Sequence, residues 1–163
     1  MRPDVPKGYG EIVKTFGDIR AYIRPDGTLR PDWERHELGL AKLARPLPLG
    51  WDLDVQVSQI RCHQKLVPLF EAIFEAIDEQ GLWEHLHTYD GCFAYRAKRT
   101  SSKLSTHAWG IAIDLNAATN LQGTDGDMSS AIVQVFESQG FKWGGRWPLP
   151  STDGMHFQYA DGH

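Results

Sequence analysis

The strongest hydrophobic pattern in the chain lies in residues 64–80. Apolar side chains recur there at intervals of three and four residues, and Gly81 follows as a stop signal. The side chains that form the pattern are Leu66, Val67, Phe70, Ile73, Phe74 and Ile77. Because this spacing places them on one face of a helix, we expect a helix over residues 64–80. A shorter stretch of the same kind, residues 9–16, ends at Gly17 and predicts a helix near the start of the chain.

Alternating patterns predict the strands of a small sheet. In residues 109–115, Ile111, Ile113 and Leu115 fall on one face, while Asp114 and smaller residues fall on the other. The small residues leave room beside Asp114 for a ligand or substrate. The other expected strands cover residues 88–96, 141–143 and 155–159. Residues 36–43 fit a strand or a helix equally well.

The remaining elements complete an α+β pattern. A helix running to about residue 139 can be capped by Asp127 or Ser129. Residues 24–28 and the proline-rich residues 45–48 and 147–150 are typical of turns. Since helices and strands follow one another in mixed order, we expect a small antiparallel β-sheet flanked by helices.

Composition limits the class of protein. With 163 residues the chain has the length of one domain, and we expect a monomer. A net charge of −4 and a pI near 5.9 argue against a nucleic-acid partner, which requires a basic face. No apolar run approaches the length of a membrane span, so we expect no stable membrane insertion. The first residues do not resemble a signal peptide, which predicts a protein that is cytoplasmic as synthesised.

Two short segments carry the candidate chemistry. One supplies His107 and Asp114, and the other supplies Asp153 and His156. Two imidazoles and one carboxylate can hold a zinc ion and leave one position open for water, as in a catalytic site. The spare carboxylate can accept the proton of that water. The pattern therefore predicts a zinc hydrolase, although each residue taken alone has an ordinary structural explanation.

Local sequence indicates how these residues could meet. Asp153 and His156 are three apart, and a tight turn with Gly154 brings such residues within about 7 Å at Cα. His107 requires a bend before the next strand, which Gly110 permits. A charged Asp114 within an apolar strand is costly unless it is paired or bound to metal.

Other polar groups allow more than one interpretation. The basic stretch Arg96, Lys98, Arg99 and Lys103 could attract an anionic substrate or could be a solvated loop. His85 and His87 could form a second metal site or, more simply, a surface pair. Asp125 and Asp127 could hold calcium, but helix capping is the simpler explanation. Cys62 and Cys92 are expected to be free thiols, with a disulfide as the alternative.

These residues resemble the M15 superfamily of zinc peptidases, which contains D-alanyl-D-alanine carboxypeptidases and L-alanyl-D-glutamate peptidases. The pattern Ser-x-His-x-x-Gly-x-Ala-x-Asp fits residues 105–114, and the later Asp or Glu-x-x-His fits residues 153–156. The residues around both segments also fit, over about residues 90–160. The first part of the chain is similar to a phage or prophage endolysin branch. The resemblance implies a Hedgehog/DD-peptidase-like zinc peptidase fold.

The resemblance implies a role for each matching residue. His107, Asp114 and His156 would bind Zn²⁺, and Asp153 would act as general base and then as acid. Many relatives have Glu at that position, so the shorter Asp153 must obtain its reach from the backbone. Arg96 would hold the scissile carbonyl oxyanion or a substrate carboxylate, with Arg99 as the alternative arginine. The remaining substrate contacts would come from Ser105 and Trp109, and Trp143 and Trp147 could line the cleft or pack in the core.

The expected activity is hydrolysis of a peptidoglycan stem peptide at the L-Ala–D-Glu bond. The alternatives are a D,D-carboxypeptidase or D-Ala-D-Ala dipeptidase on the same site, or a non-catalytic zinc-stabilised wall-binding module. We expect residues 1–163 to form one catalytic domain, with the motifs in about residues 60–163 and no separate wall-binding domain. An endolysin of this kind would reach the wall after release, with the help of a holin.

Overall fold

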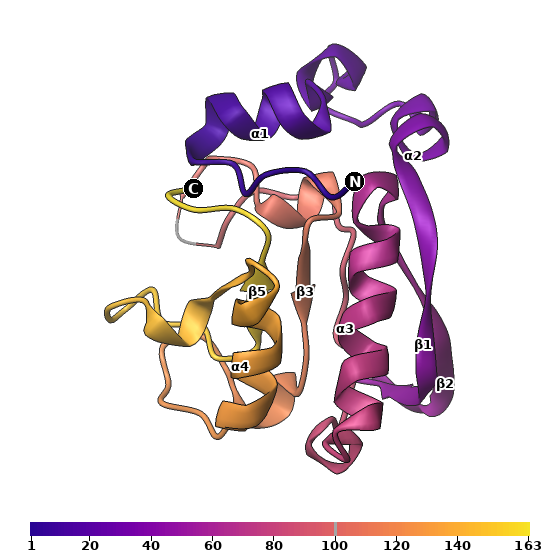
Figure 1. Cartoon of the computed structure of the whole chain (residues 1–163). Coiled ribbons are helices and arrows are strands. Elements are labelled where there is room, and N and C mark those ends of the chain that lie inside the picture. Colours follow the sequence, from indigo (N-terminus) through magenta and orange to yellow (C-terminus); the bar gives the residue numbers. More distant parts are fainter. Residues whose placement is uncertain (100) are drawn as a thin grey trace.

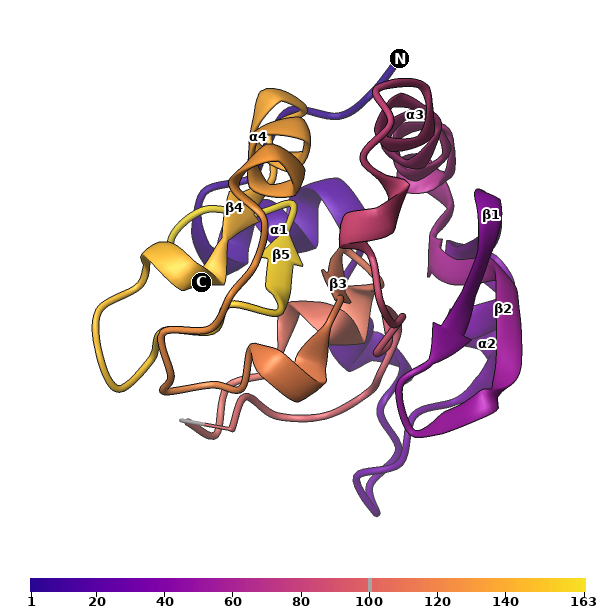
Figure 2. The same cartoon turned by 90° about the horizontal axis from the view of Figure 1, so that it is seen from below.

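Two helices lie side by side over one face of a three-stranded antiparallel sheet (Figures 1 and 2). The computed structural model describes residues 1–99 and 101–163. The helices are α3 (Val67–Glu79) and α4 (Ser130–Ser138). The sheet has the order β3-β5-β4 and contains β3 (Ala112–Asp114), β4 (Lys142–Trp143) and β5 (His156–Gln158). The expected α+β class with a small antiparallel sheet is confirmed.

The two faces of this sheet differ in character. Ile113 and Phe157 are paired across β3 and β5 and are both fully buried. The Phe157 ring stacks on Phe136 of α4, with centroids 4.3 Å apart. Because side chains alternate along a strand, the neighbouring pair, Asp114 and His156, points to the opposite face. The helices thus cover one face, and the other face carries the polar candidates.

The two helices expected from hydrophobic spacing are present. Helix α1 (Gly8–Phe16) ends at Gly17, whose φ of 102° is accessible to glycine but strained for other residues. The 64–80 pattern begins as the 3₁₀ turn η2 (Gln64–Leu66) and continues as α3. One buried cluster of apolar side chains runs from Ile12 near the start of the chain to Ala160 near its end.

A long hairpin packs against the other side of α3 (Figure 1). It consists of β1 (Leu38–Leu49) and β2 (Asp52–His63), which pair antiparallel. The prediction of a turn at residues 45–48 was wrong, because these residues lie within β1. The register shifts between Lys42 and Leu47, and such an irregularity tolerates prolines that lack an N–H. The ambiguous residues 36–43 divide between the end of helix α2 (Pro31–Glu37) and the start of β1.

The predicted strand at residues 88–96 is also wrong. The segment is irregular and makes only isolated bridges among the described residues, from Tyr89 to Leu49 and Leu115. Gly91, with φ of 119°, interrupts the extended backbone. The Asn116 side chain accepts the Thr88 N–H at 3.2 Å, so a side chain replaces a strand partner at the start of the segment.

The expected strand over residues 109–115 is shorter in the structure. Its first residue, Trp109, is the last residue of the 3₁₀ turn η4 (Thr106–Trp109), the left-handed Gly110 follows, and only β3 pairs in the sheet. The other short turns are η1 (Ile19–Tyr22), η3 (Trp83–His85), η5 (Ala117–Thr119) and η6 (Gly144–Arg146). Within the described ranges, no helix has the length and apolar character needed to cross a membrane.

Candidate metal centre

A cavity of about 230 Å³ opens on the polar face of the sheet. Asp114, Asp153 and His156 form part of its lining, and three cations, Arg96, Lys98 and Arg99, form another part. The cavity therefore combines acidic, basic and imidazole groups.

Local backbone structure brings the His107 ring against Asp114 and His156. The Ser105 hydroxyl caps η4 by accepting the His107 N–H at 3.3 Å. Gly110 then reverses the chain with φ of 68°, and its N–H bonds to the His107 carbonyl at 2.9 Å. A Cβ added at Gly110 would lie 2.7 Å from the backbone nitrogen of His63. Both the conformation and the space thus require glycine, which provides the bend that the sequence predicted.

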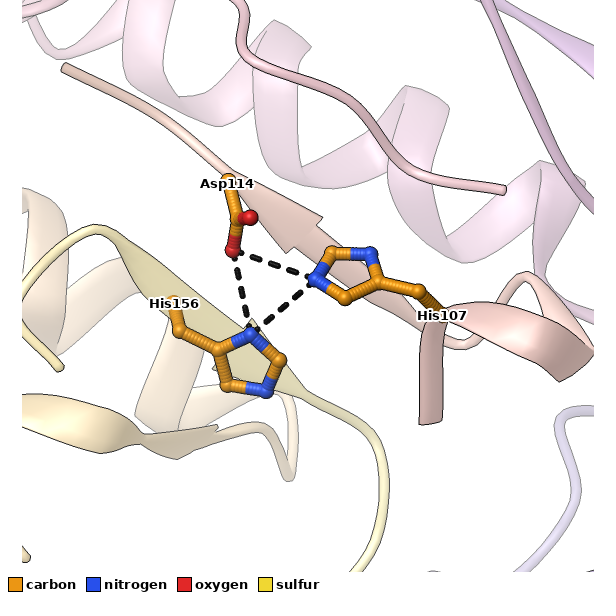
Figure 3. A group of neighbouring side chains, drawn as sticks. All are labelled: His107, Asp114 and His156. Carbon is orange, nitrogen blue, oxygen red and sulfur yellow. Dashed lines mark hydrogen bonds and ion pairs between the residues drawn. The ribbon is translucent and has the colours of Figure 1, made fainter. Parts of the chain in front are cut away.

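Three ligand atoms converge from η4, β3 and β5 (Figure 3). Asp114 Oδ1 lies 3.0 Å from His156 Nδ1 and 3.2 Å from His107 Nε2, and the two nitrogens are 3.2 Å apart. Ligands at about 2.0–2.1 Å from a tetrahedral zinc are about 3.3 Å from one another. The three atoms therefore have the spacing of one face of a zinc coordination shell.

Hydrogen bonds on the far side of each ring leave these atoms free to bind a cation. His107 Nδ1 lies 2.6 Å from the Cys92 carbonyl, which can only accept, so Nδ1 carries the proton and Nε2 presents a lone pair. His156 Nε2 lies 2.9 Å from Gln158 Oε1, another acceptor, which leaves its Nδ1 as the lone pair. Two lone pairs and a carboxylate oxygen in mutual contact repel unless a positive charge lies among them.

The pKa values of the buried cluster also indicate that a positive charge is favoured among the three ligand atoms. Burial raises the pKa of the Asp114 carboxyl, but the His107 and His156 imidazoles more than offset it and hold that pKa well below its usual range. Burial lowers the pKa of His156, but the neighbouring Asp114 carboxylate, together with the Gln158 amide oxygen and the Asp153 carboxylate, outweighs burial and raises that pKa overall. The cluster favours a positive charge at its centre, which a divalent metal ion would supply.

Asp153 lies beside this cluster on a tight turn. The His156 N–H donates to the Asp153 carbonyl at 3.1 Å, and the Asp153 N–H donates to the Gly144 carbonyl at 2.8 Å. The predicted turn is therefore present, with His156 as the first residue of β5. A Cβ at Gly144 would lie 2.5 Å from the Asp153 carbonyl oxygen, so the close approach of these two segments requires glycine.

The Asp153 carboxylate has an unusual environment. Its Oδ1 is buried with no hydrogen-bond partner among the described residues. Burial raises the pKa of this carboxyl to about 6, and the Asp114 charge adds to the rise. Asp153 also lines the cavity, and a carboxylate of raised pKa at such a place is suited to accept a proton from a water molecule.

The cationic side of the cavity comes from the loop that precedes η4. Arg96, Lys98 and Arg99 line it, and within residues 1–99 and 101–163 they form no ion pair. Many arginines elsewhere are paired, including Arg20 and Arg146. Burial lowers the pKa of Lys98, and the nearby Lys103 lowers it further. These unpaired cations can bind an anionic group of a ligand.

Some of the other residues expected to contact substrate line the cavity, and others pack in the core. Ser105 lines the cavity, but its hydroxyl serves as the η4 cap. Trp109 is fully buried away from the cavity, and its Nε1 donates to the Gly17 carbonyl at 3.0 Å. It packs in the core because the 3₁₀ turn directs it toward α1. Trp147 lines the cavity next to the His156 ring, whereas Trp143 is half-buried against the core.

Several lining residues were not anticipated from the sequence. Thr106, Gln122, Gln158 and His163 all line the cavity. The alternation of β5 could have indicated Gln158, which is two residues beyond His156 and so shares its face. No local signal marks Gln122 or His163, which come from loops.

The remaining polar candidates have local roles. Asp127 does not cap α4, whose N-cap is Ser129; its Oδ1 instead accepts hydrogen bonds from Thr119 and Asn120. In the described part of the chain, His107, Asp114 and His156 are the one group of three side chains placed to share a metal ion. Cys62 and Cys92 are buried free thiols, as expected. Burial raises the pKa of Cys62 to about 12, so this thiol is unreactive.

Comparison with known families gives a match to part of the chain. A family model described as D-alanyl-D-alanine carboxypeptidase, of the M15 peptidases, matches residues 98–159. The matched segment contains His107, Asp114, Asp153 and His156. The curated proteins contain no match to this chain.

Proposed function

We propose that this chain, which belongs to the M15 peptidase superfamily, is a zinc-dependent peptidoglycan peptidase that hydrolyses the L-Ala–D-Glu bond of the stem peptide. Peptidases of this superfamily are zinc enzymes that act on peptides of the D-Ala type found in peptidoglycan. The observation that carries the proposal is the convergence of His107 Nε2, Asp114 Oδ1 and His156 Nδ1 beside an unpaired Asp153 carboxylate. This arrangement joins a metal-binding face to a base.

The three ligand residues would hold zinc with one position open to the cavity. Bound zinc would supply a water of lowered pKa and a positive charge for the scissile carbonyl. Nitrogen and carboxylate donors of this kind suit zinc best, while cobalt or manganese would also fit. The Cys92 carbonyl fixes the His107 ring, as partners beyond the ligands commonly do in zinc enzymes.

Asp153 would move the proton. Its carboxylate would accept the proton of the attacking water and later deliver it to the leaving amine. The side chain is one methylene shorter than a glutamate, so the backbone turn that joins Asp153 to His156 and Gly144 would have to supply the missing reach. A base whose pKa is raised to about 6 by burial is close to the range in which a proton can be both taken and returned.

The cations of the cavity would bind the substrate. Arg96, with Arg99 as the alternative, would stabilise the carbonyl oxyanion or hold a carboxylate. The L-Ala–D-Glu bond is followed by residues that carry several carboxylates, whereas a terminal D-Ala carries one. The three unpaired cations on one side of the cavity therefore favour binding of a substrate for cleavage at the L-Ala–D-Glu bond. Such an enzyme would act on the wall after release from the cell that makes it.

The second candidate is a D,D-carboxypeptidase on the same site, which the description of the matching family model favours. One substrate separates the two activities, because a muramyl pentapeptide ending in D-Ala-D-Ala contains both bonds. Mass spectrometry of the zinc-loaded reaction should detect a peptide that begins with D-Glu. Loss of one D-Ala instead would assign the carboxypeptidase.

A non-catalytic wall-binding module is the remaining alternative. It would need zinc for its fold but would have no use for Asp153. Replacing Asp153 by alanine should abolish turnover and leave zinc bound if the protein is an enzyme. A binding module would show no turnover in either form and equal wall binding in both.

A further inference from the structure

The Gln158 side chain is buried next to the metal ligands without being one of them. It is 3% exposed and lies on β5, two residues after His156. Because side chains of a strand alternate, His156 and Gln158 share the polar face of the sheet. Across the strand pair, Gln158 faces Ala112, whose small side chain leaves room for the amide.

Neighbouring backbone groups fix the orientation of this amide. Gln158 Nε2 donates to the carbonyls of Ala160 and His163, at 3.2 and 3.3 Å. Carbonyl oxygens only accept hydrogen bonds, so the opposite orientation would place three acceptors together. The amide oxygen must therefore point the other way, where it accepts from Thr106 Oγ1 at 3.1 Å and lies 2.9 Å from His156 Nε2.

This orientation determines the tautomer of His156. An amide oxygen cannot donate, so His156 Nε2 must carry the proton. The neutral imidazole that binds a metal has one N–H, and its other nitrogen, Nδ1, then presents the lone pair. His156 Nδ1 is the atom that meets Asp114 Oδ1 and His107 Nε2 in the cluster.

We propose that Gln158 is a positioning residue that selects the zinc-binding tautomer and ring orientation of His156. The carbonyls of Ala160 and His163 hold the amide in the required orientation. This inference rests on the proposed zinc function of the cluster. It extends the site from its ligands to Gln158 and to the backbone carbonyls of Ala160 and His163.

Two substitutions distinguish positioning from simple packing. Gln158→Met keeps the size of the side chain and removes the acceptor. Gln158→Glu keeps an acceptor for His156 Nε2–H but places a carboxylate oxygen against two carbonyls. If Gln158 positions His156, zinc affinity should follow the order Gln, Glu, Met, since loss of such a partner costs about 10–100-fold in metal affinity. If Gln158 only packs, the glutamate variant should be the worst of the three.

The matched control is Thr106→Val. It removes a buried hydrogen bond to the same amide oxygen but leaves the contact between Gln158 and His156 intact. Its zinc affinity should stay within about threefold of the wild type, on the scale of a single neutral hydrogen bond. A loss as large as that of Gln158→Met would show that any buried hydrogen bond here has the same effect, and would overturn the proposal.

The experiment measures the dissociation constant of zinc by competition with a chromophoric chelator, for the full chain and each variant. Circular dichroism verifies folding, and long-range ¹H–¹⁵N spectra of the zinc-loaded proteins report whether His156 carries its proton on Nε2. The proposal expects that proton in the wild type and the glutamate variant. Wild-type affinity in Gln158→Met would overturn the positioning role alone. Absence of zinc binding in the wild type would overturn the proposed function and this inference with it.

Discussion

Asp114 and His156 are direct partners across the antiparallel strands β3 and β5, with Oδ1 and Nδ1 3.0 Å apart. Two of the three candidate ligands are therefore placed by the register of a sheet. A slip of one strand by one residue would turn its ligand to the opposite face and separate the two side chains. The stacked Phe157 and Phe136 rings pack on that opposite face and hold the register. The apolar core of this small sheet thus sets the geometry of the metal centre.

Zinc should stabilise the folded chain through these ligands. At a free zinc concentration one hundred times the dissociation constant, binding adds about 2.7 kcal/mol, or roughly 5–10 °C in melting temperature. His107→Ala should stay folded but lose this response, because the fold has its own apolar core. Thermal unfolding with and without zinc measures the effect. Unfolding of metal-free wild type at room temperature would instead indicate a structural metal.

Asp153→Asn should separate catalysis from metal binding. Asparagine keeps the size of the side chain but cannot accept the proton of water, so turnover should fall by about 10²–10⁴-fold. Zinc content, measured by mass spectrometry of the metal, should remain at one ion per chain. Turnover close to that of the wild type would exclude Asp153 as the base.

The same variant should change how stability depends on pH. The pKa of Asp153 rises from 3.8 to about 6 in the folded chain, so the fold favours the protonated form. This contribution to stability is complete below pH 3.8 and is lost as the pH rises through 6. Metal-free Asp153→Asn should therefore melt a few degrees above the wild type at pH 8 and together with it at pH 3.5. A higher melting temperature of Asp153→Asn at pH 3.5 but not at pH 8 would contradict a raised pKa of Asp153.

The turn that carries His107 should not tolerate a side chain at Gly110. Alanine there would adopt a left-handed conformation, and its Cβ would meet the His63 backbone at 2.7 Å. The expected loss of unfolding free energy is about 2–5 kcal/mol. Gly10→Ala is the matched control, because Gly10 lies in α1 with open space around its Cβ position and should gain about 0.5–1 kcal/mol. Denaturant unfolding measures the change in unfolding free energy for both variants. An equal change in the two would contradict a special requirement for glycine at position 110.

The cationic side of the cavity should increase the affinity for an acidic substrate. Arg99→Gln should raise KM for an acidic stem peptide about tenfold, the scale of one charged hydrogen bond, and change kcat little. The effect should vanish on a substrate whose carboxyls are amidated. Lys103→Gln is the control, because Lys103 belongs to the same basic stretch but does not line the cavity. An equal rise in KM for both variants would indicate only a general electrostatic attraction.

The sequence predicted most of the metal centre because the chemistry is local. His107 and Asp114 flank a glycine that bends the chain, and Asp153 and His156 share one turn. Sequence distance and residue type therefore determine most of their geometry. The fold class also followed from local patterns, since α1, α3 and α4 each have a hydrophobic face and a glycine after the last turn.

The parts that sequence did not predict depend on contacts between distant segments. The β1–β2 hairpin contains prolines that suggested a turn, and only pairing with β2 and packing on α3 make that segment a strand. Trp109 was expected at the substrate, but its bond to the Gly17 carbonyl, ninety-two positions away, holds it in the core. Gln158 was missed because its role arises from backbone carbonyls and a threonine that no spacing connects.

Zinc-dependent hydrolysis of peptidoglycan stem peptides can be measured by mass spectrometry of purified muropeptides after incubation with the protein. The protein should release a peptide that begins with D-Glu, this product should be lost when a chelator removes the metal, and it should return when zinc is added. Cleavage that persists in excess chelator, or no cleavage by the zinc-loaded protein, would contradict zinc-dependent hydrolysis.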